Sequence, residues 1–348
     1  MKNNPFSYSH TNKRYHTFDH YVKETFGEKV VKIGFDGGFT CPNRDGTKGF
    51  GGCSFCAGGG AESMAANGAG QDGTLAAGRT ECDGTVGKSG RQVLPLEIQY
   101  EQGRARLEKK WGRCPTIAYF QNFTSTYAPL PRLARLYEQA LCFEDVVGLT
   151  IGTRPDCLPS DLMEYLAELN GRTHLTVELG LQTTFDETAK RLNRGHSYND
   201  FLEGYTALKE RGIKVAVHLI NGLPGESREM MLENARRVAA LSPDFLKIHS
   251  LYYRKGSALG EAYLLQKEAF PVLTLEEYVS LVADQIELLP PKTVLERVTG
   301  DAERKSLLAP LWTCDKKRVV NLLDQVLEQR GSFQGKSFGV VQDAQSEG

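Results

Sequence analysis

The stretch KVVKIGFDGGFTCPNRDGTKGFGGCSFC, residues 29–56, joins a short β-branched run to a loop that carries three cysteines. The run KVVKIGF is typical of a buried strand. Cys41, Cys53 and Cys56 follow it among glycines and polar residues, whereas structural cysteines usually lie in apolar surroundings. The stretch therefore predicts a strand whose C-terminal end leads into a loop built around thiols.

Helical periodicity separates this first run from five further β-branched runs. The predicted strands are 29–35, 116–122, 146–152, 174–182, 214–220 and 244–253. Such alternation is typical of a parallel sheet, and no Gly-x-Gly-x-x-Gly follows the first strand to indicate a Rossmann nucleotide site. We predict an α/β fold, a partial (β/α)6 TIM-type barrel, with the cysteine loop at the C-terminal strand ends, where barrels carry active groups.

The sequence divides into four predicted parts. Residues 1–28 form a helical lead-in, 29–265 the partial barrel, 266–335 a mostly α-helical C-terminal appendage and 336–348 a loose tail. Within the barrel, residues 57–91 are rich in Gly and Ala and lack apolar periodicity, which predicts a flexible insertion.

Composition narrows the functional class. The net charge is −1, so the chain as a whole gives no reason to expect a polyanion or an anionic membrane. Eight cysteines in 348 residues are too sparse for a secreted disulfide scaffold. The first residues, MKNNPFSYSH, lack the apolar core of a signal peptide, and we expect a cytoplasmic location.

The cysteine loop has three interpretations. The cysteines could be unrelated buried thiols, which is what we expect elsewhere, for Cys114, Cys142, Cys157 and Cys314. They could bind zinc, with Cys53 and Cys56 joined by His16 and His20, although Cys41 would then be unused. They could also hold an iron–sulfur cluster. Three thiolates on a four-iron cluster leave one iron without a protein ligand, and an open metal position is typical of catalytic sites.

Several motifs in their order along the chain resemble a known family. The C-x11-C-x2-C loop is followed by GTRPDCL, ELGLQ, LNRGH, LINGLPGE and ERVTGD…APLW. Together they resemble the radical S-adenosylmethionine (radical SAM) enzymes, in particular the Elp3-like branch and its YhcC/YtqA-type proteins. The resemblance covers nearly the whole chain. It implies a [4Fe-4S] cluster on Cys41, Cys53 and Cys56, with SAM bound to the open iron.

The same resemblance implies a reaction and a set of contacts. SAM is cleaved reductively to a 5′-deoxyadenosyl radical that abstracts hydrogen from a substrate, and a one-electron donor of the flavodoxin or ferredoxin type is needed. ELGLQ stands where ribose-binding groups lie, LINGLPG where adenine binds, and QNFTSTY replaces the Gly-Gly-Glu stretch that holds the SAM amino group. The SAM contacts it implies are Phe55, Gln121, Asn122, Thr124, Glu178, Gln182, Arg194, Ile220, Gly222, His249 and Leu251. In that set Phe55 resembles the aromatic against adenine, and Arg194 the partner of the SAM carboxylate.

Two questions stay open in the sequence. The alternative function is a non-catalytic iron–sulfur or zinc protein, an electron carrier or sensor, although carriers normally close their cluster with four ligands.

The substrate is also open. The Elp3 relatives modify tRNA, but with an acetyltransferase domain that this sequence lacks. The basic clusters GRARLEKKWGR (103–113) and DKKR (315–318) are candidate RNA contacts, or else solvated helix faces.

Overall fold

The computed structural model describes residues 6–57, 93–270 and 272–339. The predicted insertion, apart from Ala57, lies outside the described residues, and so does Cys82 within it. The predicted tail lies outside them from residue 340 onward.

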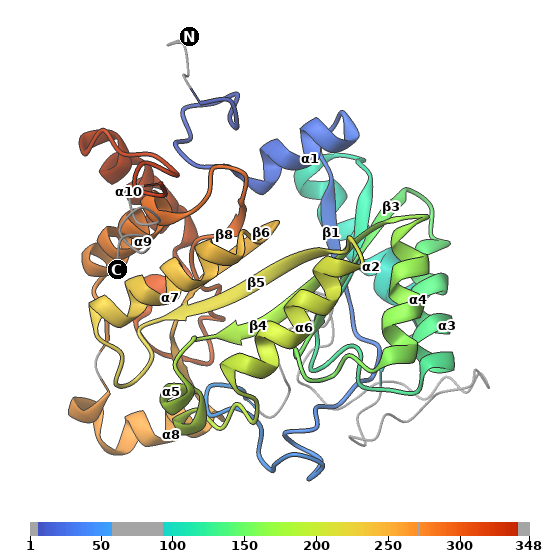
Figure 1. Ribbon diagram of the computed structural model, residues 1–348, viewed down its shortest axis with the longest axis horizontal. Helices are drawn as coiled ribbons and strands as arrows, with labels where there is room; N and C mark the ends of the chain where they lie inside the picture. The colour runs from blue at the N-terminus through green and yellow to red at the C-terminus, as the bar shows by residue number, and fades with distance from the viewer. Residues whose placement is uncertain (1–5, 58–92, 271, 340–348) are drawn as a thin grey trace.

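The core of the protein is one seven-stranded parallel sheet whose strands follow one another in space as in sequence (Figure 1). Its strands are β1 Val31–Phe35, β2 Thr116–Phe120, β3 Val146–Thr153, β4 His174–Gln182, β5 Lys214–Asn221, β6 Phe245–Ser250 and β8 Val294–Arg297. The sheet curls into a half-barrel, and the predicted α/β partial barrel is confirmed.

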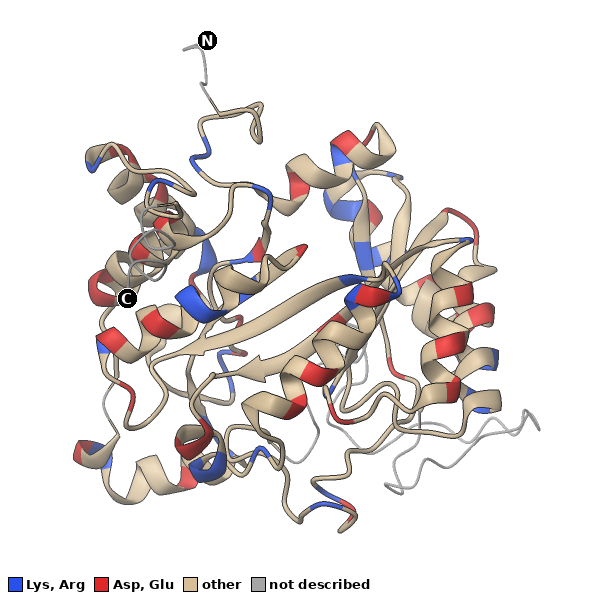
Figure 2. Ribbon diagram, viewed as in Figure 1, with Lys and Arg blue, Asp and Glu red and all other residues tan. Residues whose placement is uncertain are grey.

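Helices cover the outer face of the sheet. They are α2 Leu96–Trp111, α3 Leu130–Leu141, α4 Ser160–Asn170, α6 Tyr198–Glu210, α7 Arg228–Leu241 and α9 Leu275–Leu288. Local signals fix their ends. Ser197, for example, accepts from Asp200 N while the Asp200 carboxylate accepts from Ser197 N, a capping box that starts α6. Acidic residues are the charged residues of α4 and α9, whereas α2, α3, α6 and α7 carry both signs, so the outer layer has no uniformly basic face (Figure 2).

The N-terminal end of the barrel is closed by α1, Phe18–Phe26. Phe18 and Tyr21 pack there against Phe245 and Val294. The Leu295 amide donates to the His16 carbonyl at 2.7 Å, which fixes the segment before α1 to β8. Because this end is filled by apolar side chains, only the C-terminal end of the barrel is left for a site.

The seventh strand differs from the sequence prediction, which has six strands and places residues 266–335 in an appendage. Val294–Arg297 pairs in parallel with β6, so part of that segment belongs to the sheet. The strand is only four residues long, and its register shifts opposite Leu246 and Lys247. Its sequence therefore does not show the regular alternation of inward and outward side chains by which a strand is predicted. The rest of the segment is mostly helical, and α10, Lys316–Gln329, packs on α9.

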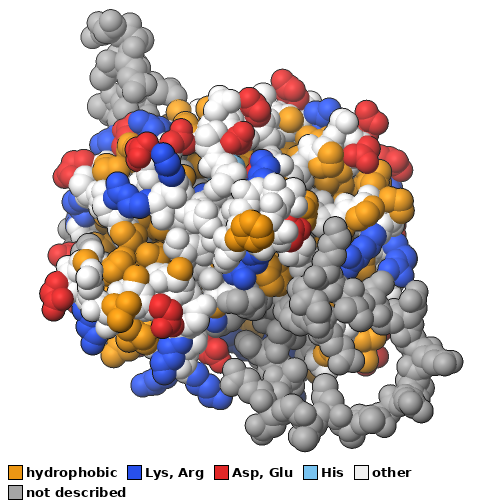
Figure 3. All heavy atoms as spheres, turned by 90° about the horizontal axis from the view of Figure 1, so that it is seen from below, with side chains coloured by type: hydrophobic (Ala, Val, Ile, Leu, Met, Phe, Trp, Pro, Cys, Tyr) orange, Lys and Arg blue, Asp and Glu red, His pale blue; other side chains and the backbone are white. Residues whose placement is uncertain are grey.

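Short elements complete the C-terminal end of the barrel. They are α5 Asp186–Arg191, β7 Tyr253–Arg254, α8 Ala258–Leu265, the 3-10 helices η1 Lys267–Ala269 and η2 Leu311–Cys314, and β9 Leu307–Ala309, which pairs with β7. Viewed from this end, hydrophobic side chains gather on the left of the molecule (Figure 3). Leu264 and Leu265 of α8 are among the exposed hydrophobic residues. No helix in the described ranges is both long enough and apolar enough to cross a bilayer.

The two edges of the half-barrel, β1 and β8, are not paired with each other in the described structure. A side-chain contact joins them instead. Lys32 Nζ of β1 lies 2.8 Å from Glu296 Oε2 of β8, and both side chains are largely buried. An ion pair therefore spans the gap that an eighth strand would fill in a closed barrel.

Candidate functional site

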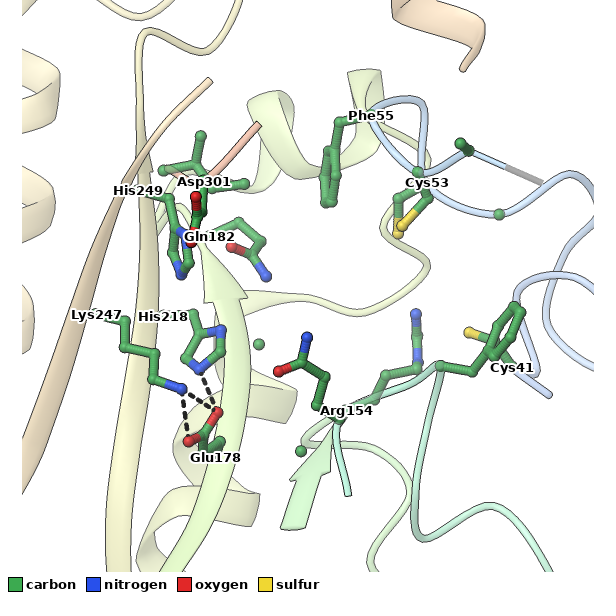
Figure 4. A pocket seen from close by; sticks show the side chains of 18 of the residues that line it. Cys41, Cys53, Phe55, Arg154, Glu178, Gln182, His218, Lys247, His249 and Asp301 are labelled. Atoms are coloured by element: carbon green, nitrogen blue, oxygen red, sulfur yellow. Dashed lines mark hydrogen bonds and ion pairs between the residues drawn. The ribbon is translucent and has the colours of Figure 1, made fainter. Parts of the chain in front are cut away.

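A cavity of about 580 Å3 occupies the C-terminal end of the barrel. Its wall combines the cysteine loop, an apolar side, a polar floor and the C-terminal ends of the inner strands. Figure 4 shows Cys41 and Cys53 on one side of this space, with Lys247 and Glu178 on the other. The prediction that the cysteine loop lies at this end of the strands agrees with this arrangement.

The cysteine loop is held by backbone hydrogen bonds. Cys56 N donates to Cys53 O at 2.8 Å, and Ser54 N donates to Leu192 O at 2.9 Å. Gly52 has φ +79° and is packed so closely that a Cβ would lie 2.7 Å from Arg44 Nε. The glycines therefore let the chain turn tightly, and the loop keeps all three thiols beside the cavity.

The thiols lie in a positively charged setting. Arg194 Nη1 is 3.1 Å from Cys53 Sγ, and the same guanidinium donates to the Gly180 carbonyl. A hydrogen bond from Cys56 lowers the pKa of Cys53 well below its ordinary value, assisted by the charge of Arg194. The partner thiol, Cys56, has its pKa raised, because it shares that hydrogen bond and is partly buried. Thiolate is the form in which cysteine binds metals, so the setting favours ligation.

The spacing of the thiols bears on which metal group fits. A single tetrahedral zinc ion, with Zn–S bonds of about 2.3 Å, needs ligand atoms roughly 4 Å apart. Within the described residues, the one set of three ligands within 4.8 Å of one another is His10, His20 and Glu24. The three loop cysteines form no such compact set, which suits a larger group such as an iron–sulfur cluster.

The zinc interpretation with His16 and His20 does not agree with the structure. The His16 carbonyl bonds β8 at the N-terminal end of the barrel, and His20 stacks edge-on with His10. Cys53 and Cys56 line the cavity at the opposite end of the barrel. The structure thus keeps these histidines apart from the thiols.

Arg194 is positioned by a second arginine. Arg154 Nη1 donates to the Arg194 carbonyl at 2.6 Å, and Arg154 Nε and Nη2 bind the Asp156 carboxylate at 2.9 Å each. A bidentate pair of this kind fixes both position and orientation. Arg194 Nε is buried and has no hydrogen-bond partner among the described residues. A buried donor without a partner indicates that an acceptor is still to be supplied.

One side of the cavity is apolar. Phe55 and Ile220 pack in a cluster with the buried Leu251. The Phe55 ring lies 6.0 Å from the Arg194 guanidinium carbon. Such a surface beside a charged group suits a flat, mostly apolar ring with a polar substituent.

The floor of the cavity is a buried polar network centred on Glu178, whose side chain has no exposed area. Lys247 Nζ lies 2.6 Å from each of its oxygens, and Lys32 Nζ lies 3.0 Å away. Tyr119 Oη donates to the carboxylate at 2.6 Å, and His218 Nε2 lies 3.0 Å from it (Figure 4). These four neighbours therefore already occupy both oxygens of the Glu178 carboxylate, which would have to accept from the hydroxyl of a bound ligand such as a ribose.

The charges of this network are set by the lysines. Burial alone would raise the pKa of Glu178, but Lys247 and Lys32 lower it well below its ordinary value. Burial and the negative charge of Glu178 raise the pKa of Tyr119. Burial lowers the pKa of His249, so this imidazole is neutral. Two ammonium groups are thus balanced by the carboxylates of Glu178 and Glu296.

Most of the sequence-predicted site residues line this one cavity. Those that do are Cys41, Cys53, Phe55, Cys56, Gln121, Thr124, Glu178, Gln182, Arg194, Ile220, His249 and Leu251. Asn122 lies outside it and donates to the Asp36 carboxylate at 3.0 Å, which fixes the loop after β1. Gly222 also lies outside it, on a small hollow next to Leu273. The roles predicted for the individual contacts stay predictions.

Other cavity residues are absent from the sequence prediction. Lys247, Tyr119 and Arg297 line the cavity, and Lys32 supports its floor. A signal was present in FLKIHS, where Lys247 alternates with the buried Leu246 and Ile248. A lysine at such a position of a strand must face the inside of the barrel, because Leu246 and Ile248 pack in the hydrophobic core.

The cysteines outside the loop agree only in part with their prediction as buried thiols. Cys114 and Cys157 are buried. Cys142 and Cys314 are exposed, because the first ends α3 and the second ends η2 at the surface.

Comparison with known proteins gives one consistent result. Residues 41–238 match the Radical SAM superfamily, and residues 243–329 match the Radical_SAM C-terminal domain. The protein YtqA of Bacillus subtilis is 44% identical over 338 residues, which is 97% of both chains. Human elongator complex protein 3 is 32% identical over 159 residues, 44% of this chain and 28% of that protein. The solved archaeal Elp3 of Methanocaldococcus infernus, with an N-terminal deletion, shares the fold at a TM-score of 0.57 and 22% identity, over 68% of this chain and 59% of that chain.

Proposed function

The chain belongs to the radical SAM superfamily, and from this premise we propose that it is an enzyme that cleaves SAM reductively to act on a further substrate. Cys41, Cys53 and Cys56 are its proposed ligands for a [4Fe-4S] cluster. When bound, cluster and SAM supply a 5′-deoxyadenosyl radical that abstracts hydrogen from the substrate. An external one-electron donor, of the flavodoxin or ferredoxin type, completes the proposal.

The observation that carries this proposal is the arrangement at one cavity of three thiols and the Arg194 Nε, which has no hydrogen-bond partner in the part of the chain that the structure describes. Arg194 favours the thiolate of Cys53 by its charge, and its buried Nε is the proposed donor to the SAM carboxylate. Phe55, Ile220 and Leu251 offer an apolar surface for adenine and exclude water there.

The proposed contacts to the ribose and the amino group of SAM follow from which polar side-chain atoms already have hydrogen-bond partners in the described structure. Because four neighbours already bind the Glu178 carboxylate, we assign the proposed ribose contact to Gln182. Thr124 Oγ1 is buried without a hydrogen-bond partner among the described residues, and it is the proposed acceptor for the SAM amino group. His249 Nε2 is partnerless in the same sense and faces the cavity as a neutral imidazole.

Anaerobic reconstitution tests the proposal. The chain is loaded with iron and sulfide, then given SAM and a chemical reductant, and 5′-deoxyadenosine is measured by chromatography. We expect product from the unsubstituted chain, none from Cys56→Ala, and unchanged yield from the control Cys142→Ala, whose thiol is exposed and outside the cavity. A stable cluster that yields no 5′-deoxyadenosine would instead favour the electron carrier or sensor.

For the substrate class we propose RNA, by analogy with the Elp3-like branch. Arg104 and Arg113 of the first basic cluster pair with Asp145, as solvated helix charges would. Arg106, however, lines the cavity, and burial together with the charges of Arg297 and Lys110 lowers the pKa of Lys316. Parts of both basic clusters therefore lie near the same opening.

Salt dependence tests the RNA proposal. We expect binding of total tRNA to weaken steeply between low and physiological salt, and to weaken uniformly across sequences in Arg106→Gln. The exposed Arg211→Gln, on the far side of the sheet at the end of α6, is the control. Binding that is insensitive to salt, or equal in both variants, would exclude this substrate class.

A further inference from the structure

The strand β8 carries a register irregularity at the wall of the cavity. Leu246 pairs with Leu295, but the next residue of β6, Lys247, pairs with Arg297. Glu296 is therefore an extra residue. An irregularity of this kind re-aims a side chain, and it is common beside active sites. It lets two successive residues of β8, Glu296 and Arg297, face the inside of the half-barrel.

These two residues differ in their partners. Glu296 lies 2.8 Å from Lys32 and 3.3 Å from Lys247. Arg297 lines the cavity and is half-buried, yet the described part of the chain gives its guanidinium no hydrogen bond or ion pair. A half-buried guanidinium without an acceptor is unusual, because removing charge from water is costly unless a partner compensates.

The charges around Arg297 do not supply that partner. Lys247 and the network below it are already balanced, and His249 is neutral. The positive charge of Arg297 helps to lower the pKa of Lys316, after burial. Asp301 lies on the same wall, but its side chain is half-exposed and 3.9 Å from Lys316. Glu303 also lines the cavity, but within the described residues neither acid forms an ion pair with Arg297, whose charge on this wall is left uncompensated at ion-pair distance.

We propose that Arg297 binds an anionic group of the substrate, a carboxylate or a phosphate, inside the cavity. A guanidinium suits this task because its fixed fork of donors matches both groups in bidentate fashion. The site rests on the proposed function, since it assumes that the cavity holds a substrate beside SAM. It is distinct from the proposed SAM carboxylate site, because Arg194 is fixed to Cys53 and Gly180 whereas Arg297 stands on the edge strand beside Lys247.

Anion binding to the reconstituted, SAM-loaded protein tests the site. The probes are inorganic phosphate, followed by 31P line width, and 13C-labelled acetate, followed by 13C line width, at constant ionic strength. We expect saturable binding of at least one probe. Affinity should fall at least about tenfold in Arg297→Gln and by a smaller factor in Arg297→Lys, which keeps the charge but loses the fork. Arg304→Gln, an exposed arginine outside the cavity, is the control and should bind as the unsubstituted chain does.

The pattern of results separates the outcomes. Binding of phosphate alone indicates a phosphate on the substrate, and binding of acetate alone indicates a carboxylate. The site is refuted if neither probe saturates, if Arg297→Gln binds as well as the control, or if SAM competes with the probe. Far-ultraviolet circular dichroism confirms that each variant is folded. The titration does not depend on 5′-deoxyadenosine, so saturable binding without that product would refute the proposed function and leave the anion site standing.

Discussion

Replacing Glu178 by Gln is expected to destabilise the fold strongly. The Glu178 carboxylate accepts from Lys247 at 2.6 Å and from Lys32 at 3.0 Å, and its side chain has no exposed area. The amide is neutral, so two buried ammonium groups would share the single charge of Glu296. Breaking a buried ion pair by removing one partner costs about 3–5 kcal/mol. With an unfolding entropy of about 2.1 cal/mol/K per residue, that cost lowers Tm by roughly 4–7 °C in a chain of 348 residues.

Thermal and urea unfolding measure this effect. The control is Glu233→Gln, since Glu233 pairs with Arg237 at 3.1 Å on the exposed side of α7 and should lose less than about 1 kcal/mol. A second substitution, Lys32→Met, removes the surplus positive charge. In the double variant we expect about 1–3 kcal/mol of the loss to be recovered relative to additivity.

Two results would refute this reasoning. One is a Glu178→Gln variant that melts within about 1 °C of the unsubstituted chain, because the carboxylate would then not be compensating two buried charges. The other is strict additivity of Glu178→Gln and Lys32→Met, which would show that the two side chains are not coupled.

Three further predictions concern other parts of the molecule. Gly180→Ala places a Cβ 3.1 Å from Gln182 Nε2 and 3.2 Å from Arg194 Nη2, both proposed SAM contacts, so SAM affinity measured by equilibrium dialysis should fall about tenfold. Phe55→Ala removes part of the apolar surface and should weaken SAM binding by about 1.5–3 kcal/mol, whereas Phe55→Leu should lose less. Burial, with a smaller effect of Lys214, lowers the pKa of His174 to about 4, below its value near 6.5 in the unfolded chain. The unfolded state therefore binds more protons as pH falls from about 6.5 to 4, and about 2–3 kcal/mol of stability should be lost in urea titrations over that range.

Controls make these predictions specific. Gly339→Ala tests the general cost of adding a methyl group, since Gly339, like Gly180, is not in the left-handed region and a Cβ there meets nothing within 4 Å. A loss of SAM affinity in this control equal to that of Gly180→Ala would contradict the roles given to Arg194 and Gln182. For the pH effect, His174→Gln should flatten the acid loss of stability, and an unchanged slope would show that another group is responsible.

Much of the fold follows from sequence pattern, because each strand–helix unit is a local signal. The runs around HLTVELGLQ and KVAVHLI combine β-branched residues with a following helix, and both became inner strands. The strand β8 was missed for a physical reason. Its four residues are too few to show a period, and they become a strand only because β6 offers a free edge.

The site could be predicted only where one segment carries the signal. The cysteine loop is contiguous, so Cys41, Cys53 and Cys56 could be assigned together. The polar floor is assembled from five strands, and no window of sequence contains Lys32, Tyr119, Glu178, His218 and Lys247 at once. Asn122 illustrates the reverse error. Its place in the chain is right for a ligand contact, but its side chain points to Asp36 and away from the cavity.

The contact between Lys32 and Glu296 has a consequence for the width of the barrel. Backbone ladders fix neighbouring strands at about 4.8 Å, whereas a lysine and a glutamate have several rotatable bonds each. The seam between β1 and β8 can consequently widen by rotamer changes without breaking any of the hydrogen bonds within the sheet. A change in the width of the half-barrel therefore disrupts less of the backbone at this seam than between any two of its paired strands.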